Sequence, residues 1–162
     1  MIDKDGYRAN VGIVIVNATN QVLLAQRIGS AHAWQFPQGG VDPGESPRQA
    51  MYRELQEELG LQASEVAYLT ETPDWYAYEI PEPYRRQGEH PVCVGQRQKW
   101  FLLALAAEDS CIRLTAPEVP PEFSTWAWRD FFSPIDEVIY FKQGVYRQVL
   151  DFFWAYLHSE GT

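Results

Sequence analysis

The chain has 162 residues, of which 46% are hydrophobic and 14% aromatic, and its formal net charge at pH 7 is −9. This length suits one globular domain, residues 1–162, with a sizeable core. The negative charge disfavours sequence-independent binding along a nucleic-acid backbone, because such binding needs Lys and Arg to replace counterions. An acidic protein can still act on a phosphorylated end that metal ions neutralise locally.

Cellular location is indicated by what the sequence lacks. No apolar run reaches the roughly 18 residues of a transmembrane helix. The first ten residues are charged and lack the apolar core of a signal peptide. Two cysteines, Cys93 and Cys111, are too few for a disulfide framework, and we expect both to pack as small hydrophobic side chains. The sequence predicts a cytoplasmic protein without a membrane segment, by default a monomer, and identifies no protein partner.

Hydrophobic periodicity predicts the order of the elements. Strands are expected at residues 8–17, 21–28, 65–72, 74–80, 91–107 and 122–128. Helices are expected at residues 46–59, for a short stretch from Ser133-Pro134, and at residues 143–157. Residues 34–37 lead into a glycine-rich loop, and residues 108–121 form a polar, proline-rich connection. Strands before and after a central helix, closed by a terminal helix, predict an α/β fold in which a sheet is sandwiched between helices.

The segment at residues 39–61, GGVDPGESPRQAMYRELQEELGL, combines this glycine-rich loop with an acidic helix. Ser46 followed by Pro47 is typical of a helix start, and Gly60 is typical of a helix end. Apolar side chains recur at helical spacing and are expected to face a core. These residues are Met51, Tyr52, Leu55 and Leu59.

Three glutamates of this helix, Glu54, Glu57 and Glu58, share one face because they are spaced i, i+3 and i+4. One interpretation is a solvated acidic face balanced by Arg53. The preceding glycines favour another, since they let the backbone approach a ligand closely, while Glu45 can tie the loop to the helix. Hard oxygen ligands beside such a loop suit Mg²⁺, Mn²⁺ or another divalent cation, and therefore phosphate chemistry.

The glycines, carboxylates and arginine of this segment match every fixed position of the Nudix box, G-x5-E-x7-R-E-U-x-E-E-x-G-U with U aliphatic. The chain therefore resembles the Nudix hydrolases, whose fold is a mixed β-sheet between α-helices and which hydrolyse a nucleoside diphosphate linked to another group. Five further segments resemble the bacterial RNA 5′-pyrophosphohydrolases within that family. They are IDKDGYRANVGIVIVN, WQFPQGGVDPGES, PVCVGQRQKWFLL, PEF at 121–123 and FKQGVYRQV at 141–149.

This resemblance implies removal of pyrophosphate from the 5′-triphosphate end of RNA, leaving a 5′-monophosphate and initiating mRNA decay. Dinucleoside-polyphosphate hydrolases, which cleave substrates such as diadenosine tetraphosphate, share much of the signature and are the alternative. A catalytically inactive Nudix domain that senses nucleotides is a third hypothesis. Such a domain would lack a box carboxylate, and none is missing here.

The resemblance also implies a catalytic set. The metal ligands would be Glu54, Glu57, Glu58 and Glu122, together with a backbone carbonyl near Gln38 or Gly39. Arg53 would orient a carboxylate through a bidentate contact. Glu122, which lies outside the box, would serve as a metal ligand or as the general base, although an exposed carboxylate at a strand end is the alternative.

The implied substrate-binding residues are mostly cationic. Arg8, Arg27 and Lys142 would hold phosphates, or they could be solvated charges. Gln96 is a candidate for a contact with a base or a phosphate. Phe141 could stack on a base, or it could pack against the terminal helix. His32, His90 and His158 show no metal-ligand spacing and are expected at the surface.

Overall fold

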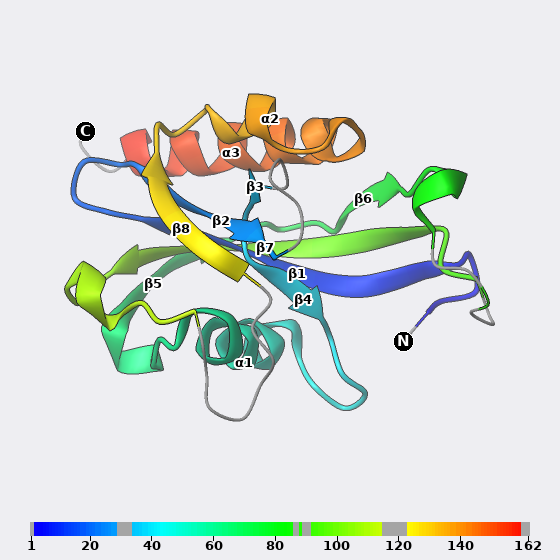
Figure 1. The fold of residues 1–162 in the computed structure, drawn as a ribbon, viewed down its shortest axis with the longest axis horizontal. Coiled ribbons are helices and arrows are strands. Elements are labelled where there is room, and N and C mark those ends of the chain that lie inside the picture. Colours follow the sequence, from blue (N-terminus) through cyan, green and yellow to red (C-terminus); the bar gives the residue numbers. More distant parts are fainter. Residues whose placement is uncertain (1, 29–33, 86–87, 89–91, 115–122, 160–162) are drawn as a thin grey trace.

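A computed structural model describes residues 2–28, 34–85, 88, 92–114 and 123–159. Within these ranges eight strands form one mixed sheet, with α1 on one face and α2 and α3 on the other (Figure 1). The predicted α/β fold, a mixed sheet between helices, is therefore confirmed.

The observed elements follow the predicted order. The strands are β1 (Tyr7–Val16), β2 (Val22–Arg27), β3 (Trp34–Gln35), β4 (Gln38–Gly40), β5 (Val66–Glu71), β6 (Tyr76–Glu79), β7 (Gly95–Leu105) and β8 (Phe123–Arg129). The α-helices are α1 (Pro47–Leu59), α2 (Pro134–Glu137) and α3 (Gln143–Ser159), and 3₁₀ turns lie at Ala63–Glu65, Glu82–Tyr84, Asp109–Cys111 and Tyr140–Lys142. The short strands β3 and β4 lie at the glycine-rich loop and its approach, where the sequence predicts no strand.

The long strand β1 is the centre of the sheet. It pairs in parallel with β7, from Tyr7 opposite Gly95 to Val16 opposite Ala104, and antiparallel with β2 and β4. The main path is β3-β2-β1-β7-β5, and β4, β6 and β8 pair with β1, β7 and β2 respectively. The antiparallel pairing of β4 with β1 holds the glycine-rich segment against the sheet, next to the start of α1.

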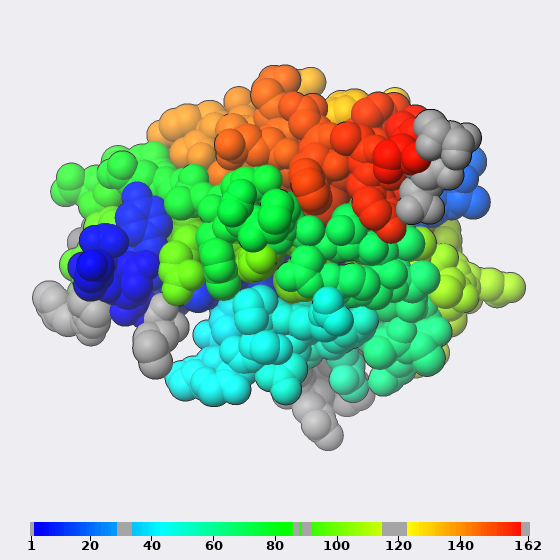
Figure 2. All heavy atoms as spheres, turned by 180° about the vertical axis from the view of Figure 1, so that it is seen from behind, coloured from blue at the N-terminus to red at the C-terminus, as the bar shows by residue number. Residues whose placement is uncertain are grey.

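Alternation along β1 divides the core into two layers. Val14 and Val16 pack with α2 and α3, whereas Val11, Ile13 and Ile15 pack with α1. Successive side chains of a strand point to opposite faces, so one apolar run supplies both layers. Strand β7 alternates between the layers in the same way. Seen from behind, α3 runs along one edge of the molecule and the segment that begins α1 lies along the opposite edge (Figure 2).

Helix α1 begins and ends where the sequence predicts. The Ser46 side chain accepts a hydrogen bond from the Gln49 N–H, and the Gln49 side chain accepts one from the Ser46 N–H, which completes a capping box. Gly60 ends the helix with φ of 66°, a left-handed conformation that suits glycine. Three of the four predicted core residues, Met51, Leu55 and Leu59, are fully buried, and Tyr52 is partly buried.

The terminal helix α3 covers the second layer with its predicted apolar face. Val145, Val149 and Phe153 are buried, while Phe152 and Leu157 are partly buried against them. The structure leaves Cys93 and Cys111 as free, half-buried thiols. No helix in the described ranges is long and apolar enough to cross a membrane.

Candidate active site

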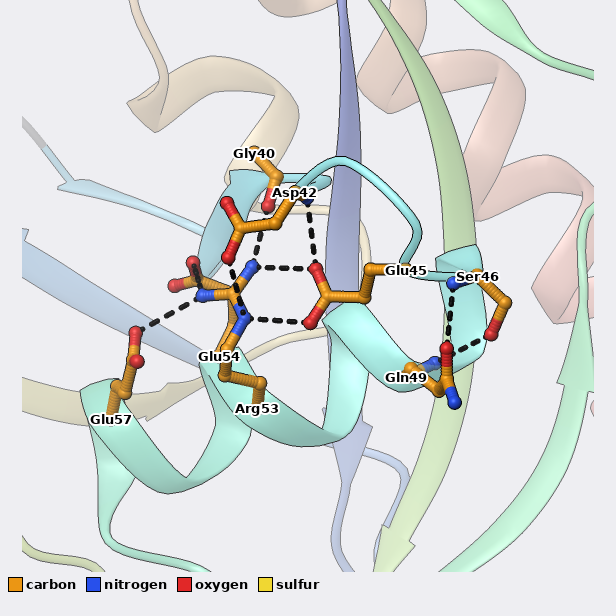
Figure 3. A network of polar contacts seen from close by, with 8 residues as sticks. All are labelled: Gly40, Asp42, Glu45, Ser46, Gln49, Arg53, Glu54 and Glu57. Carbon is orange, nitrogen blue, oxygen red and sulfur yellow. Dashed lines mark hydrogen bonds and ion pairs between the residues drawn. The ribbon is translucent and has the colours of Figure 1, made fainter. Parts of the chain in front are cut away.

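Arg53 is the centre of a polar network that joins the glycine-rich loop to α1 (Figure 3). Its Nε and Nη2 donate to the two carboxylate oxygens of Glu45 at 2.8 and 3.0 Å. Nη2 also donates to the Gly40 carbonyl at 2.7 Å. Nη1 donates to Glu54 at 2.8 Å and to Glu57 at 3.2 Å. One planar guanidinium therefore orients three carboxylates, and the carboxylate held by its bidentate contact is Glu45.

Charge pairing keeps Glu45 and Arg53 ionised. The Arg53 guanidinium lowers the pKa of the Glu45 carboxyl, and the Asp42 N–H, which donates to Glu45 at 2.9 Å, acts in the same direction. The hydrogen bond to Glu45, with the further contact to Glu54, raises the pKa of Arg53. Both side chains therefore remain charged at neutral pH, and the link between loop and helix is an ion pair.

Two of the three box glutamates on α1 are buried. Glu54 and Glu58 are each 7% exposed, whereas Glu57 is partly exposed. The backbone of β4 rests directly on one of them, because a Cβ added to Gly39 would lie 2.0 Å from the Glu54 carboxyl carbon. Burial of Glu54 and Glu58 contradicts the interpretation of this face as simply solvated.

The carboxylates of the loop and helix are hard oxygen donors, the ligand type that divalent cations such as Mg²⁺ prefer. Among the described residues no three His, Cys, Asp or Glu side chains gather closely enough to hold an ion, and Glu122 lies outside the described ranges. The loop and helix carry five carboxylates, Asp42, Glu45, Glu54, Glu57 and Glu58, and the guanidinium of Arg53 contacts the first four of them. Buried anions require compensating positive charge. The predicted ligand set of Glu54, Glu57 and Glu58, with the main chain near Gln38, therefore stays a prediction.

A pocket of about 320 Å³ contains all five predicted substrate-binding side chains in its wall. They come from separate elements of the fold and lie far apart in the sequence. Arg8 lies on β1, Arg27 ends β2, Gln96 lies on β7, and Phe141 and Lys142 belong to one 3₁₀ turn. The parallel pairing of β1 with β7 sets Arg8 opposite Gln96. The fold therefore gathers three cations, an amide and an aromatic ring.

Gln38 of β4 links this pocket to the carboxylates. Its side chain lines the pocket, and the next residue, Gly39, lies against Glu54. The buried amide of Gln98 donates to Gln38 Oε1 at 3.2 Å and to Asn10 Oδ1 at 2.8 Å. Consecutive residues of one short strand thus place the basic pocket beside the acidic helix.

The pocket wall contains polar groups suited to a ligand. Lys142 is only 8% exposed, and its Nζ lies 5.7 Å from the centre of the Tyr78 ring. Burial raises the pKa of Tyr78 to about 12, so its hydroxyl stays neutral and can donate a hydrogen bond. Gln96 Oε1 is buried and has no hydrogen-bond partner within the described part of the chain. An acceptor in that position matches an N–H or O–H group of a ligand.

Sequence reasoning missed several lining residues, including Tyr78, Tyr84 and Arg85. The alternation of β6 could have indicated Tyr78, which is buried, but Tyr84 and Arg85 lie in a proline-containing turn without periodicity. Phe141 both lines the pocket and packs against the layer beneath α3, so both predicted roles are compatible with its position.

Of the three histidines, the structure describes only His158. His158 packs on Trp154 near the end of α3, with ring centres 3.9 Å apart. His32 and His90 lie outside the described residues. The predictions for these two side chains, like that for Glu122, therefore stay predictions.

Comparisons with known proteins agree with this geometry. Residues 6–150 match the model of the NUDIX domain. The RNA pyrophosphohydrolase of Francisella tularensis subsp. mediasiatica (strain FSC147) is 53% identical over 157 residues, which cover 97% of this chain and 99% of that protein. The RNA pyrophosphohydrolase of Shewanella sp. (strain ANA-3) is 53% identical over 150 residues, covering 93% and 85%.

Solved structures share the fold. The E. coli dihydroneopterin triphosphate pyrophosphohydrolase superposes with a TM-score of 0.73 at 26% identity, covering 91% of this chain and 96% of that one. A C. elegans Ap4A hydrolase superposes with a TM-score of 0.66 at 23% identity, covering 94% and 98%. The intact box, the sheet between helices and these matches lead to one assignment: the chain belongs to the NUDIX family of hydrolases, which generally act with divalent cations.

Proposed function

We propose that this protein acts in the cytoplasm as an RNA pyrophosphohydrolase with Mg²⁺ as its cation. It removes pyrophosphate from the 5′-triphosphate end of RNA and leaves a 5′-monophosphate, which initiates mRNA decay. The observation that carries this proposal is the basic pocket beside the box carboxylates, with all five candidate substrate-binding side chains in its wall. Two relatives named RNA pyrophosphohydrolase, each 53% identical over most of the chain, support the same activity.

Charge explains why the 5′ end is the part recognised. A triphosphate concentrates several negative charges, and Arg8, Arg27 and Lys142, which line the pocket, would contact its oxygens. Lys142 is largely shielded from solvent, so its attraction for phosphate is weakly screened. The net charge of −9 disfavours contacts with the backbone further along the RNA. Phe141 offers a ring for a base, and Gln96 Oε1 can accept a hydrogen bond from a base N–H group.

The carboxylates beside the pocket have different proposed roles in the reaction. Bound at Glu54, Glu57 and Glu58, the cation would neutralise phosphate charge and activate the attacking water. Arg53 keeps Glu45, Glu54 and Glu57 in fixed positions. Glu122, as a further ligand or as the general base, completes the proposed set.

The experiment that tests this function follows the 5′ end of one RNA. A triphosphorylated oligonucleotide is incubated with the protein in Mg²⁺ or in EDTA, and 5′-monophosphorylated product is measured together with released pyrophosphate or phosphate. We expect product only with Mg²⁺, and we expect Glu57→Gln to abolish its formation under the same conditions. Intact RNA after incubation with Mg²⁺ would contradict the proposal.

Diadenosine tetraphosphate is the alternative substrate, because it presents a similar phosphate chain and an aromatic base to the same pocket. We expect some cleavage of it. If the protein cleaves only this dinucleotide, it is a dinucleoside-polyphosphate hydrolase, another activity found in the same family.

A further inference from the structure

Two tyrosines beside the pocket have no role in the proposed function. Tyr84 is 53% exposed and Tyr140 is 61% exposed, and they are the two most exposed large hydrophobic side chains in the described part of the chain. Their ring centres lie 6.4 Å apart with planes at 70°, although the residues come from distant parts of the sequence. Tyr84 also lines the pocket.

Phe141 joins both tyrosines to the pocket. Its ring centre lies 5.3 Å from that of Tyr84 and 5.5 Å from that of Tyr140. The ring centre of Phe141 also lies 5.9 Å from that of Tyr78, which is buried. The four rings therefore form one aromatic cluster around Phe141, which extends from the pocket wall beside Lys142 to the exposed surface.

Short turns with main-chain hydrogen bonds carry the two exposed rings. The Tyr84 N–H donates to the Pro81 carbonyl at 2.8 Å, and the next side chain, Arg85, donates from Nε to the Ile80 carbonyl at 2.7 Å. The turn that carries Tyr140 is closed by the Lys142 N–H, which donates to the Ile139 carbonyl at 3.0 Å. Tyrosine side chains that extend from ordered turns and contact neighbouring rings lose little conformational freedom when a flat ligand stacks on them.

We propose that Tyr84 and Tyr140 form a stacking shelf for a nucleobase downstream of the RNA 5′ end. This inference rests on the proposed function, because an RNA whose phosphates lie among Arg8, Arg27 and Lys142 can leave the pocket over the aromatic cluster. Stacking on aromatic rings tolerates any base, so the shelf adds affinity for single-stranded RNA without sequence preference. It also needs no further basic residues, which suits an acidic protein.

The first test compares RNA lengths. We measure kcat/KM for a triphosphorylated single-stranded hexamer and for a triphosphorylated dinucleotide, and take the ratio of the two. The double substitution Tyr84→Ala/Tyr140→Ala should lower this ratio about tenfold, mainly through the KM of the hexamer. Tyr84→Phe/Tyr140→Phe should preserve the ratio, since the ring faces remain. Phe132→Ala is the matched control, because Phe132 is an exposed aromatic that packs on Trp154 of α3 and does not line the pocket.

The second test does not depend on cleavage. In EDTA, 5′-monophosphorylated hexamers that carry 2-aminopurine at the second, third or fourth position are titrated with protein, and fluorescence quenching reports stacking of that base. We expect quenching at one downstream position in the unmodified protein, and its loss with weaker binding in the double alanine variant.

The outcomes separate the shelf from the proposed function. If triphosphorylated RNA is cleaved but the double alanine variant retains the length ratio and the quenching, the shelf is wrong and the function stands. If the double alanine variant lowers kcat/KM by the same factor for both RNAs, the tyrosines support the fold of the site, and the shelf is again wrong. If the unmodified protein neither cleaves nor binds RNA, both proposals are overturned.

Discussion

The close contact between Gly39 and Glu54 predicts the effect of adding a methyl group at residue 39. In Gly39→Ala, the added Cβ would lie 2.0 Å from the Glu54 carboxyl carbon and 2.2 and 2.4 Å from its oxygens. Ordinary contacts begin at 3.4 Å, so the carboxyl group must retreat by about 1.4 Å, the difference between 3.4 and 2.0 Å. Glu54 is buried and held by Arg53, and therefore cannot move away into solvent.

The expected effect is on catalysis more than on folding. A misplacement of about 1 Å in a catalytic group can cost on the order of 10²-fold in rate, so we expect kcat/KM on triphosphorylated RNA to fall about 100-fold. Overpacking should cost about 1–3 kcal/mol of unfolding free energy, which a domain of this size tolerates. Pyrophosphate release and thermal denaturation measure the two effects on the same preparation.

Gly40 provides the matched control on the same strand. A Cβ added at Gly40 meets no atom within 4 Å, and the carbonyl that Arg53 contacts is unchanged by Gly40→Ala. We expect Gly40→Ala to retain activity within about twofold. Near wild-type activity of Gly39→Ala, or an equal loss in the two variants, would refute the idea that β4 positions Glu54.

Three further predictions concern the glutamates. Glu57→Gln and Glu58→Gln should each lower activity by about 10²-fold or more. Circular dichroism should show an intact fold in both variants, because repulsion between carboxylates on α1 is relieved. Normal turnover in either variant would remove that carboxylate from the site. Glu122→Ala should lower kcat more than it raises KM, whereas a pure KM effect would assign Glu122 to substrate positioning. Glu45→Gln should cost about 1–2 kcal/mol of unfolding free energy at pH 7 through the weakened contact with Arg53. Because the pKa of Glu45 is lowered in the folded protein, this contribution is present above its unfolded value of 4.5 and is lost as pH falls through the folded value. Denaturation of both proteins from pH 7 to pH 3 should therefore show a difference that shrinks below pH 4.5, and a constant difference would contradict the ion pair.

Local signals predicted much of the fold. Ser46 and Gly60 indicated the two ends of α1, and the continuous apolar run at residues 8–17 indicated a strand, which the structure shows as β1. Each of these features depends on neighbouring residues alone. The parallel pairing of β1 with β7 depends on residues far apart in the sequence, and only the family resemblance predicted a mixed sheet.

The same distinction applies to the site. Helical spacing placed Glu54, Glu57 and Glu58 on one face, but it could not show that Glu54 and Glu58 are buried. For Glu54, burial follows from contact with β4, a strand of three residues that is too short to produce a periodic pattern and that pairs with the distant β1. Tyr84 and Tyr140 escaped prediction because they lie in 3₁₀ turns, where side-chain spacing does not indicate which residues meet.

The most direct test of substrate identity is the ratio of kcat/KM for a short triphosphorylated RNA to kcat/KM for diadenosine tetraphosphate, measured with Mg²⁺ on one preparation. We expect the RNA to be the better substrate, and we expect Lys142→Ala and Phe141→Ala to lower kcat/KM for it because both side chains line the pocket. A tenfold preference for the dinucleotide would contradict the RNA assignment, and unchanged rates in both variants would remove Phe141 and Lys142 from the site.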